Sequence, residues 1–198
     1  ARSNNVARAL RQRGACDGTK VAFYMRNRPE YGELMAACFK GRLTHVNINY
    51  RYVAEEVLYI FADSDSEVIV YSSEFRDCIV ELKDRLGKVH TFVEIGEASQ
   101  IAPFAIPYET LAQEGDGTAL AIVRSPDDLL FIYTGGTTGR PKGAMLTHAN
   151  LTNNVQQAAY FFPETNFGEE VMMGVLPIFH VFAMTVVMNF SVHAGAKM

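Results

Sequence analysis

The segment from Tyr133 to Gly143 has the composition of an anion-binding loop. It reads Y-T-G-G-T-T-G-R-P-K-G, and glycine lets a backbone approach a ligand closely, so that several N–H groups can point at anionic oxygens. Its side chains add hydroxyl groups and one ammonium group, at Thr134, Thr137, Thr138 and Lys142. Together these donors suit a triphosphate.

The spacing in this loop differs from that of P-loop nucleotide-binding proteins. Their pattern, G-x-x-x-x-G-K-[ST], requires a glycine before the lysine and a hydroxyl residue after it. Here Pro141 precedes Lys142 and Gly143 follows it. The loop is therefore predicted to hold phosphate groups with a different arrangement of donors.

Histidines are the next candidates for chemistry. His180 ends the apolar run Leu176–His180, and a histidine in such a run is more often a hydrogen-bonded core residue than a reactive one. The remaining histidines have no spacing typical of a metal site, so surface or capping roles are predicted for His45, His90, His148 and His193.

Acidic residues and cysteines give no metal site either. Asp127 and Asp128 follow Ser125-Pro126 and are predicted to form the solvated start of a strand rather than a magnesium pair. The three cysteines are far apart and lack C-x-x-C spacing, which predicts buried thiols in a reducing, cytoplasmic environment: Cys16, Cys38 and Cys78.

The elements that must position these residues alternate along the chain. Apolar periodicity predicts helices up to about residue 13 and over residues 29–41, 54–62, 75–86 and 148–161, and strands over 21–25, 45–49, 67–71, 90–95 and 128–134. Helices between short buried strands form βαβ crossovers, so the predicted fold class is α/β with a largely parallel sheet. The strand over 128–134, the glycine loop and the helix over 148–161 have a phosphate-binding layout.

The stretch 96–125 is rich in glycine, proline and acidic residues, which predicts a surface excursion rather than a packed element. It divides the chain into a first α/β part, residues 1–125, and a second part, residues 126–198, that carries the loop and His180. The first residues lack a starting Met and a signal sequence, which predicts a processed or truncated N-terminus.

Composition excludes several functional classes. The chain has 198 residues, of which 48% are hydrophobic, so a globular protein is predicted and disorder is not. The formal net charge is -4 and the basic residues are scattered, which argues against a nucleic-acid partner. Residues 171–190 contain no Asp, Glu, Lys or Arg, but Gly174, Pro177, His180 and Asn189 interrupt the run. A buried strand, a loop and a buried helix are predicted there, with at most peripheral membrane contact.

The glycine loop resembles the signature T-S-G-T-T-G-x-P-K-G of the AMP-forming adenylating superfamily, which includes acyl-CoA synthetases, luciferases and peptide-synthetase adenylation domains. Gly135 stands where serine is most frequent, as it does in some fatty-acyl-CoA synthetases. The stretches Arg26–Glu30 and Asn47–Tyr52 are similar to the family's N-x-P-E and N-x-R-Y segments and are interpreted as scaffold. Leu176–His180 resembles the family's L-P-x-F-H, although Ala183 replaces a frequent glycine.

This resemblance implies the N-terminal part of an enzyme most like a bacterial fatty-acyl-CoA synthetase, without the C-terminal lobe and inactive alone. It implies ATP, Mg²⁺ and coenzyme A as cofactors or co-substrates, and a carboxylic acid, expected to be a fatty acid, as substrate. The residues implied to bind ATP are Thr134, Gly135, Gly136, Thr137, Thr138, Gly139 and Lys142. Lys142 and His180 are the implied catalytic residues, with His180 at the junction of the acyl and nucleotide sites.

Two other interpretations stay open at this point. One is an aryl or amino-acid adenylating domain, whose specificity residues lie mostly further along the chain. The other is a non-catalytic nucleotide-binding module that keeps the loop alone. An ordinary glycine-rich surface turn is disfavoured, because the matched positions occur in order and directly after an apolar strand.

Overall fold

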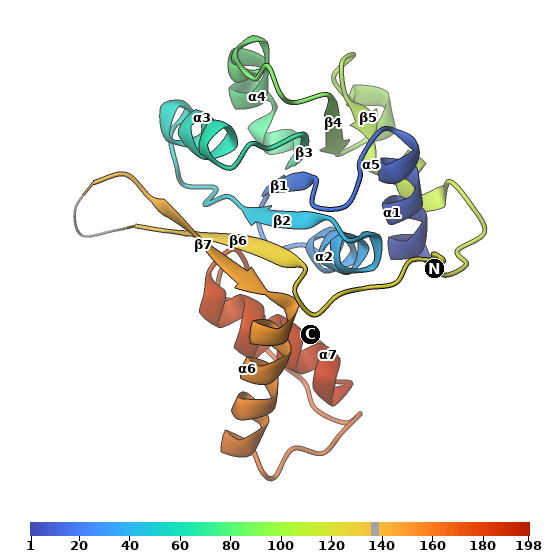
Figure 1. Cartoon of the computed structure of the whole chain (residues 1–198), viewed down its shortest axis with the longest axis vertical. Coiled ribbons are helices and arrows are strands. Elements are labelled where there is room, and N and C mark those ends of the chain that lie inside the picture. Colours follow the sequence, from blue (N-terminus) through green and yellow to red (C-terminus); the bar gives the residue numbers. More distant parts are fainter. Residues whose placement is uncertain (136–138) are drawn as a thin grey trace.

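The structure is a computed structural model that describes residues 1–135 and 139–198. Within these residues a seven-stranded sheet has the order β5-β4-β3-β1-β2-β6-β7 (Figure 1). The strands are β1 (Lys20–Tyr24), β2 (Thr44–Asn47), β3 (Val68–Ser72), β4 (Thr91–Ile95), β5 (Ile106–Pro107), β6 (Leu129–Thr134) and β7 (Lys142–Thr147). Neighbouring strands from β5 to β6 are parallel, and β7 runs antiparallel to β6. The predicted α/β class with a largely parallel sheet is confirmed.

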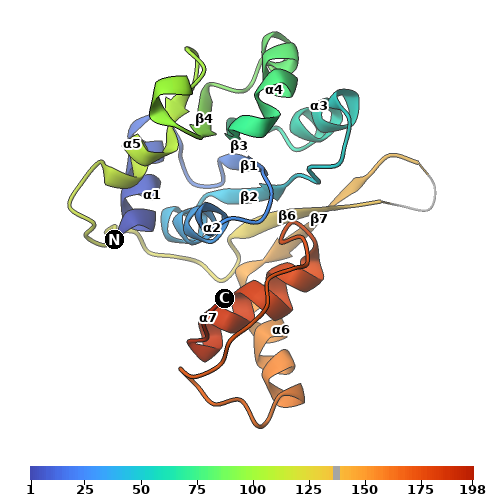
Figure 2. The same cartoon turned by 180° about the vertical axis from the view of Figure 1, so that it is seen from behind.

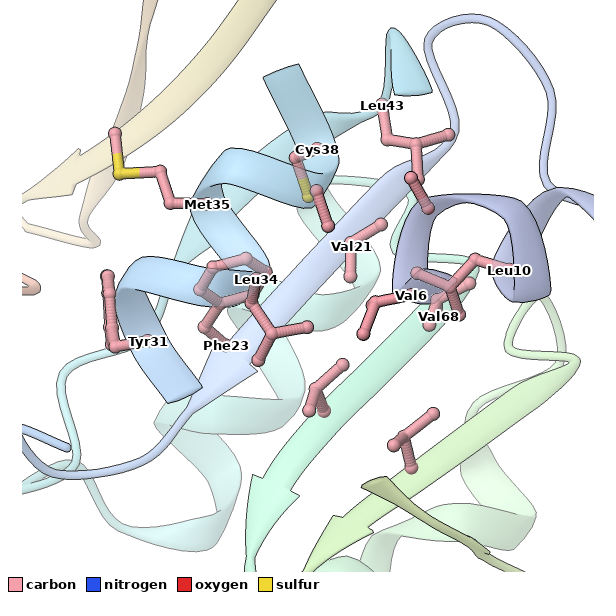
Figure 3. Close-up of a cluster of buried hydrophobic side chains, with 14 of the residues drawn as sticks. Val6, Leu10, Val21, Phe23, Tyr31, Leu34, Met35, Cys38, Leu43 and Val68 are labelled. Carbon is pink, nitrogen blue, oxygen red and sulfur yellow. The ribbon is translucent and has the colours of Figure 1, made fainter. Parts of the chain in front are cut away.

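Helices cover both faces of this sheet. They are α1 (Arg2–Gln12), α2 (Pro29–Gly41), α3 (Ala54–Asp63), α4 (Arg76–Leu82), α5 (Tyr108–Gln113), α6 (His148–Phe161) and α7 (Phe190–Ala194), with short 3₁₀ turns at Ser73–Phe75, Lys83–Arg85 and Ala98–Gln100. Val21 and Phe23 of β1 face the core formed with α1, α2 and α5 (Figure 3), whereas Ala22 and Tyr24 face the core formed with α3 and α4. Because side chains alternate along a strand, β1 contributes to both cores.

The boundaries of α2 fix the start of β6. Proline occupies the first turn of this helix, where its missing N–H costs nothing, and Arg42 ends it in the left-handed conformation at φ 55°. The Arg42 guanidinium donates to both carboxylate oxygens of Asp128, at 2.8–3.1 Å, and this ion pair lowers the pKa of the Asp128 carboxyl. Asp128 is therefore a mostly buried ion-pair partner, and the prediction of a solvated residue was wrong for it.

Most predicted elements occur within a few residues of their expected bounds, but the stretch 96–125 is not only a surface excursion. It contains β5, which extends the sheet, and α5, whose Tyr108 and Leu111 are buried in the core with α1. Pro107 ends β5 and precedes α5, and glycines follow α5, so composition over the whole stretch concealed a short packed helix. The division at residues 125 and 126 stays a prediction, and β6 joins β2 in the same sheet.

The C-terminal part is less buried than the rest. After α6 the chain runs through an extended segment to η4, a helical segment of π type at Ala183–Asn189, and then α7. Val171 makes a single parallel bridge to Lys197, and the side chains of Val171, Met173 and Val175 are exposed. The predicted buried strand at the start of 171–190 was therefore wrong, while η4 confirms the buried helix. Within the described part of the chain, no helix has the length and apolar character needed to cross a bilayer.

Two predictions for polar residues of the core were also wrong. His45 is fully buried in β2, where its Nε2 lies 3.1 Å from the Tyr31 hydroxyl, so it has neither a surface nor a capping role. Of the cysteines, Cys38 is buried, but Cys16 is exposed and Cys78 is partly exposed. Both errors arise because spacing along the chain does not reveal which face of an element a side chain occupies.

Candidate functional site

The described residues on either side of the glycine loop end β6 and begin β7, which run antiparallel, and these paired ends extend beyond the rest of the sheet (Figure 1). Thr134 and Lys142 are paired directly across the mouth of this β6–β7 hairpin, so their side chains leave the same face of the sheet. Both are exposed, as are Gly135 and Gly139, and Gly139 has φ +133°, which favours glycine. The predicted ligands Gly136, Thr137 and Thr138 lie outside the described residues.

The hairpin corrects the predicted order of strand, loop and helix. Between the loop and α6 lies β7, which the sequence interpretation missed, and six residues of strand place the start of α6 roughly 17 Å from Lys142. That start is capped by its own side chains: Thr147 Oγ1 accepts from the Asn150 N–H at 3.1 Å, and Asn150 Oδ1 accepts from the Thr147 N–H at 2.9 Å. The positive end of this helix therefore does not contribute to the loop.

Gly143 has a packing role rather than a ligand-binding one. It pairs with Tyr133 across the hairpin, and a β-carbon at this position would lie 3.0 Å from the tyrosine ring. The ring thus lies over the glycine, and its hydroxyl donates to Asp63 of α3 at 2.7 Å. Burial and this hydrogen bond both raise the pKa of Tyr133 above its usual range, so the hydroxyl keeps its proton as a donor.

A second contact from α3 holds the far side of the loop. The Tyr59 hydroxyl donates to the carbonyl of Pro141 at 3.2 Å, and the Arg140 guanidinium lies over the Tyr59 ring, 5.2 Å from its centre. Such a stacked cation gains electrostatic attraction from the ring. Both ends of the loop are therefore fixed to one helix through Tyr59 and Tyr133.

His180 lies at the turn that leads into η4, and its side chain is exposed. Its own N–H donates to the Pro177 carbonyl at 3.0 Å, while its Nδ1 accepts from the Phe182 N–H at 3.3 Å. The expectation from the residues alone, a hydrogen-bonded core histidine, was wrong because the ring is open to solvent. With Nδ1 engaged by the backbone, Nε2 is the nitrogen left to meet a ligand.

Two asparagines hold the segment that carries His180. Asn27 donates to the carbonyls of Gly174 and Leu176 at 3.0 and 2.7 Å, and accepts from the Ile178 N–H at 2.8 Å. Asn47 donates to the Phe179 carbonyl at 2.6 Å. Figure 2 shows the turn ahead of the last helix next to β6 and β7, and these side chains account for that placement.

Asn27 and Asn47 were interpreted as scaffold, and their contacts with the site were missed. The signal was available: each is a polar residue close to the carboxyl end of a buried strand, β1 or β2. The carboxyl ends of parallel strands meet at one edge of a sheet, and ligands of open α/β sheets bind at that edge. The hairpin loop leaves the same edge at the end of β6, beside β2.

The structure therefore brings Thr134, Lys142 and the His180 turn to one edge of the sheet. Asp127 and Asp128 lie at the opposite end of β6 and have no part in this site. Within the described residues, no group of three or more His, Cys, Asp or Glu side chains is placed to hold a metal ion.

An apolar cavity of about 340 Å³ lies between α2, α6 and the helical segment that follows His180. Met35 and Phe39 come from α2, Leu151 and Val155 from α6, and Met188 lies eight residues after His180, about two helical turns. The methionines and phenylalanines of 172–190 divide between roles: Met184 and Phe190 are core residues, Met188 also lines the cavity, and Met173 and Phe182 are exposed.

Comparison with known proteins adds a family match to this geometry. The family model described as AMP-binding enzyme matches residues 1–198. The 3-oxocholest-4-en-26-oate–CoA ligase of Rhodococcus rhodochrous is 36% identical over 153 residues, covering 76% of this chain and 28% of that enzyme. A long-chain-fatty-acid–CoA ligase of Escherichia coli O6:H1 is 30% identical over 213 residues, covering 93% of this chain and 38% of the enzyme.

A solved structure supports the fold. The ATP-bound MatB of Rhodopseudomonas palustris superimposes with a TM-score of 0.83 and 27% sequence identity, covering 100% of this chain and 38% of MatB. The chain thus spans about a third of the length of these relatives.

Proposed function

Because this chain belongs to the AMP-binding enzyme family, we propose that the gene product containing it activates a carboxylic acid with ATP, forming an acyl adenylate and then an acyl-CoA. The observation that carries the proposal is the β6–β7 hairpin, which presents Thr134 and Lys142 as a facing pair beside the His180 turn. A phosphate-binding group and a candidate acyl-site residue therefore share one edge of the sheet.

The nucleotide half of the reaction follows from the charges at the hairpin. A carboxylate and ATP repel each other, so the enzyme must neutralise the triphosphate and stabilise the departing pyrophosphate. The exposed Lys142 ammonium and Thr134 hydroxyl supply a positive charge and a donor on the same face. The remaining loop ligands, Gly135, Gly136, Thr137, Thr138 and Gly139, are proposed to add backbone and hydroxyl donors. The ATP-bound state of a relative supports ATP as the ligand.

The acid half rests on His180 and on the apolar cavity along the same helical segment. We assign His180 Nε2 to the carboxylate of the acid, which it would orient for in-line attack on the α-phosphorus. The cavity favours a hydrophobic acid, and the two curated relatives are named as ligases of a steroid acid and of long-chain fatty acids. A fatty or similarly apolar acid is therefore the proposed substrate class.

The proposal also includes coenzyme A and Mg²⁺, to which we assign no binding residues in the described part of the chain. The CoA ligase names of the relatives support coenzyme A as the acceptor of the acyl group. Since the described residues offer no carboxylate cluster for a metal, Mg²⁺ is proposed to be bound chiefly by the phosphate oxygens of ATP.

The test is exchange of labelled pyrophosphate into ATP by the intact gene product, with Mg²⁺ and a panel of acids. The panel contains acetate, octanoate, hexadecanoate, benzoate and leucine. The proposal expects the fastest exchange with octanoate or hexadecanoate, followed by acyl-CoA formation when coenzyme A is added. Exchange with benzoate or leucine alone would establish the aryl or amino-acid alternative. Absence of exchange with every acid, together with ATP binding, would leave a non-catalytic nucleotide-binding module.

The 198-residue chain alone is proposed not to form an acyl adenylate, because it spans only about a third of its relatives. Incubation of this chain with ATP, Mg²⁺ and hexadecanoate, followed by mass spectrometry, tests that statement. Detection of the acyl adenylate would overturn it.

A further inference from the structure

Asn47 is an unusual residue for its position in the core. It is the last residue of β2, 2% exposed, and it follows three other buried strand residues. A buried amide is costly unless its donor and acceptor both find partners. The hydrogen-bond partners of the Asn47 amide therefore decide whether its burial is tolerated.

Both partners of Asn47 are backbone groups, and they belong to the two halves of the site. Its Oδ1 accepts from the Tyr133 N–H at 2.7 Å, and its Nδ2 donates to the Phe179 carbonyl at 2.6 Å. Since a backbone N–H can only donate and a carbonyl can only accept, the orientation of the amide is fixed. Among the uncharged side chains of this size, only an asparagine offers an acceptor and a donor side by side.

The neighbours of these two backbone groups are the proposed reactive residues. Tyr133 immediately precedes Thr134, the first proposed phosphate ligand, and Phe179 immediately precedes His180. One amide group thus links the strand that leads into the loop to the turn that presents the histidine. The two segments are 46 residues apart in the chain, and within the described residues no other side chain bonds to both of them.

Other contacts hold each half separately. The loop is fixed to α3 by Tyr59 and by the hydroxyl of Tyr133, and the segment before His180 is fixed by Asn27. Loss of the Asn47 amide would leave both halves in place locally. What it would change is the position of one half relative to the other.

We propose that Asn47 is a positioning residue that sets His180 against the glycine loop, so that the acid and the triphosphate meet in register. This inference rests on the proposed function for its catalytic consequence. Its structural content, the coupling of the two segments through one amide, is independent of the substrate.

The test compares three variants of the intact gene product. Asn47→Leu is of similar size and removes both hydrogen bonds without adding charge. Asn47→Asp keeps the acceptor for the Tyr133 N–H but places a second oxygen against the Phe179 carbonyl oxygen. An ionised carboxylate repels that carbonyl, whereas a protonated carboxyl group donates its O–H to it. Asn49→Asp is the matched control, because the side-chain Oδ1 of Asn49 accepts from the Arg51 N–H at 3.0 Å, a bond that aspartate keeps.

For catalysis, kcat and KM are measured with ATP, Mg²⁺ and the acid of fastest exchange. Both Asn47 variants are expected to lower kcat/KM for the acid by about tenfold or more, with less than about threefold change in KM for ATP. Relative to wild type, the Asn47→Asp variant should recover activity as the pH falls from 8 to 6, and the Asn47→Leu variant should not. Asn49→Asp should match wild type throughout.

A second measurement does not depend on activity. Hydrogen exchange followed by mass spectrometry should show faster exchange in peptides covering 129–134 and 178–184 of the Asn47→Leu variant, with β1 and β3 unchanged. If wild type is active and both Asn47 variants keep its kcat/KM for the acid, the inference is overturned. A loss of activity that is matched by a loss of melting temperature would also overturn it. An inactive wild type would refute the proposed function, and the exchange data would then decide the coupling alone.

Discussion

The strands β1 to β4 and the hairpin β6–β7 belong to one sheet but are built in contrasting ways. Phe23 and Val70 lie in strands covered on both faces, and their side chains are fully buried. Met145 in the middle of β7 is 67% exposed. The site thus lies on the least covered part of the sheet, and side chains from the well-packed part, at Asn47, Tyr59 and Asp63, reach out to hold it.

This difference separates two tasks within one fold. Burial on both faces supplies the stability of the first region, since apolar contact with helices dominates folding energetics. Leu130 and Ile132 of β6 are buried, but β7 and the end of β6 gain little from burial and instead have donors open to solvent, as a site for a highly charged ligand requires. Mutations in the two regions should therefore affect different measurable quantities.

The largest expected effect is on stability and comes from the covered strands. Phe23→Ala removes a fully buried ring that contacts Tyr31 and His45, and should lower the free energy of unfolding by about 3–5 kcal/mol. Phe161→Ala is the matched control, because the Phe161 side chain is 82% exposed, and a change below about 0.5 kcal/mol is expected. Urea unfolding followed by circular dichroism measures both. Equal losses would contradict the view that burial between the sheet and its helices sets the stability of the covered strands.

Next in size is an effect on activity alone. Lys142→Ala should lower the rate of pyrophosphate exchange by about 100-fold, equivalent to roughly 2.7 kcal/mol of transition-state stabilisation, because a charge facing the leaving pyrophosphate is lost. The melting temperature should stay within about a degree of wild type, since the side chain is exposed. Lys88→Ala, which removes an exposed lysine paired with Asp65, is the control expected to leave the rate unchanged. Parallel losses of activity and melting temperature would argue against the catalytic role.

The smallest expected effect is a pH dependence that originates in the covered strands. Burial lowers the pKa of His45 from 6.5 to about 3, so below pH 6.5 the unfolded chain binds a proton that the folded chain does not. Proton uptake by the unfolded chain therefore lowers the free energy of unfolding. The effect is absent well above pH 6.5 and grows as the pH falls toward 3. Between pH 7 and 5 the loss should be roughly 1–2 kcal/mol.

His45→Gln tests this pH dependence, because glutamine keeps a polar partner for the Tyr31 hydroxyl and does not titrate. Its free energy of unfolding should fall less steeply than that of wild type between pH 7 and 5. His90→Gln, at an exposed position, should follow the wild-type curve. Identical slopes for all three proteins would show that burial does not lower the pKa of His45.

How far the sequence could predict the molecule follows the same contrast. The covered strands and their helices were predicted well, because burial imposes apolar runs and a regular alternation with helices. β7 was missed because most residues of Lys142–Thr147 are exposed, so burial imposes no alternating apolar pattern on them. The strand is defined by its hydrogen bonds to β6, which a pattern along the sequence does not reveal. Short packed elements such as α5 were concealed by the glycine and proline around them.

The candidate site was predictable in its residue types and not in its supports. Thr134 and Lys142 could be chosen from chemistry and spacing, but their facing arrangement depends on the hairpin register. Asn47 is 86 residues from Tyr133 and 132 from Phe179, and no local pattern links side chains so distant in the chain. Tertiary hydrogen bonds of this kind become visible only once the fold is known.

The last strand of the sheet has a practical consequence for handling the isolated chain. Within the described residues β7 ends the strand order, so one row of its backbone N–H and C=O groups has no neighbouring strand. Such an edge is a template for pairing with another molecule, and β7 contains no proline to prevent it. Concentrated solutions of this chain should therefore form edge-to-edge aggregates, and a charged residue in place of the exposed Met145 is the first change to make when expressing it alone.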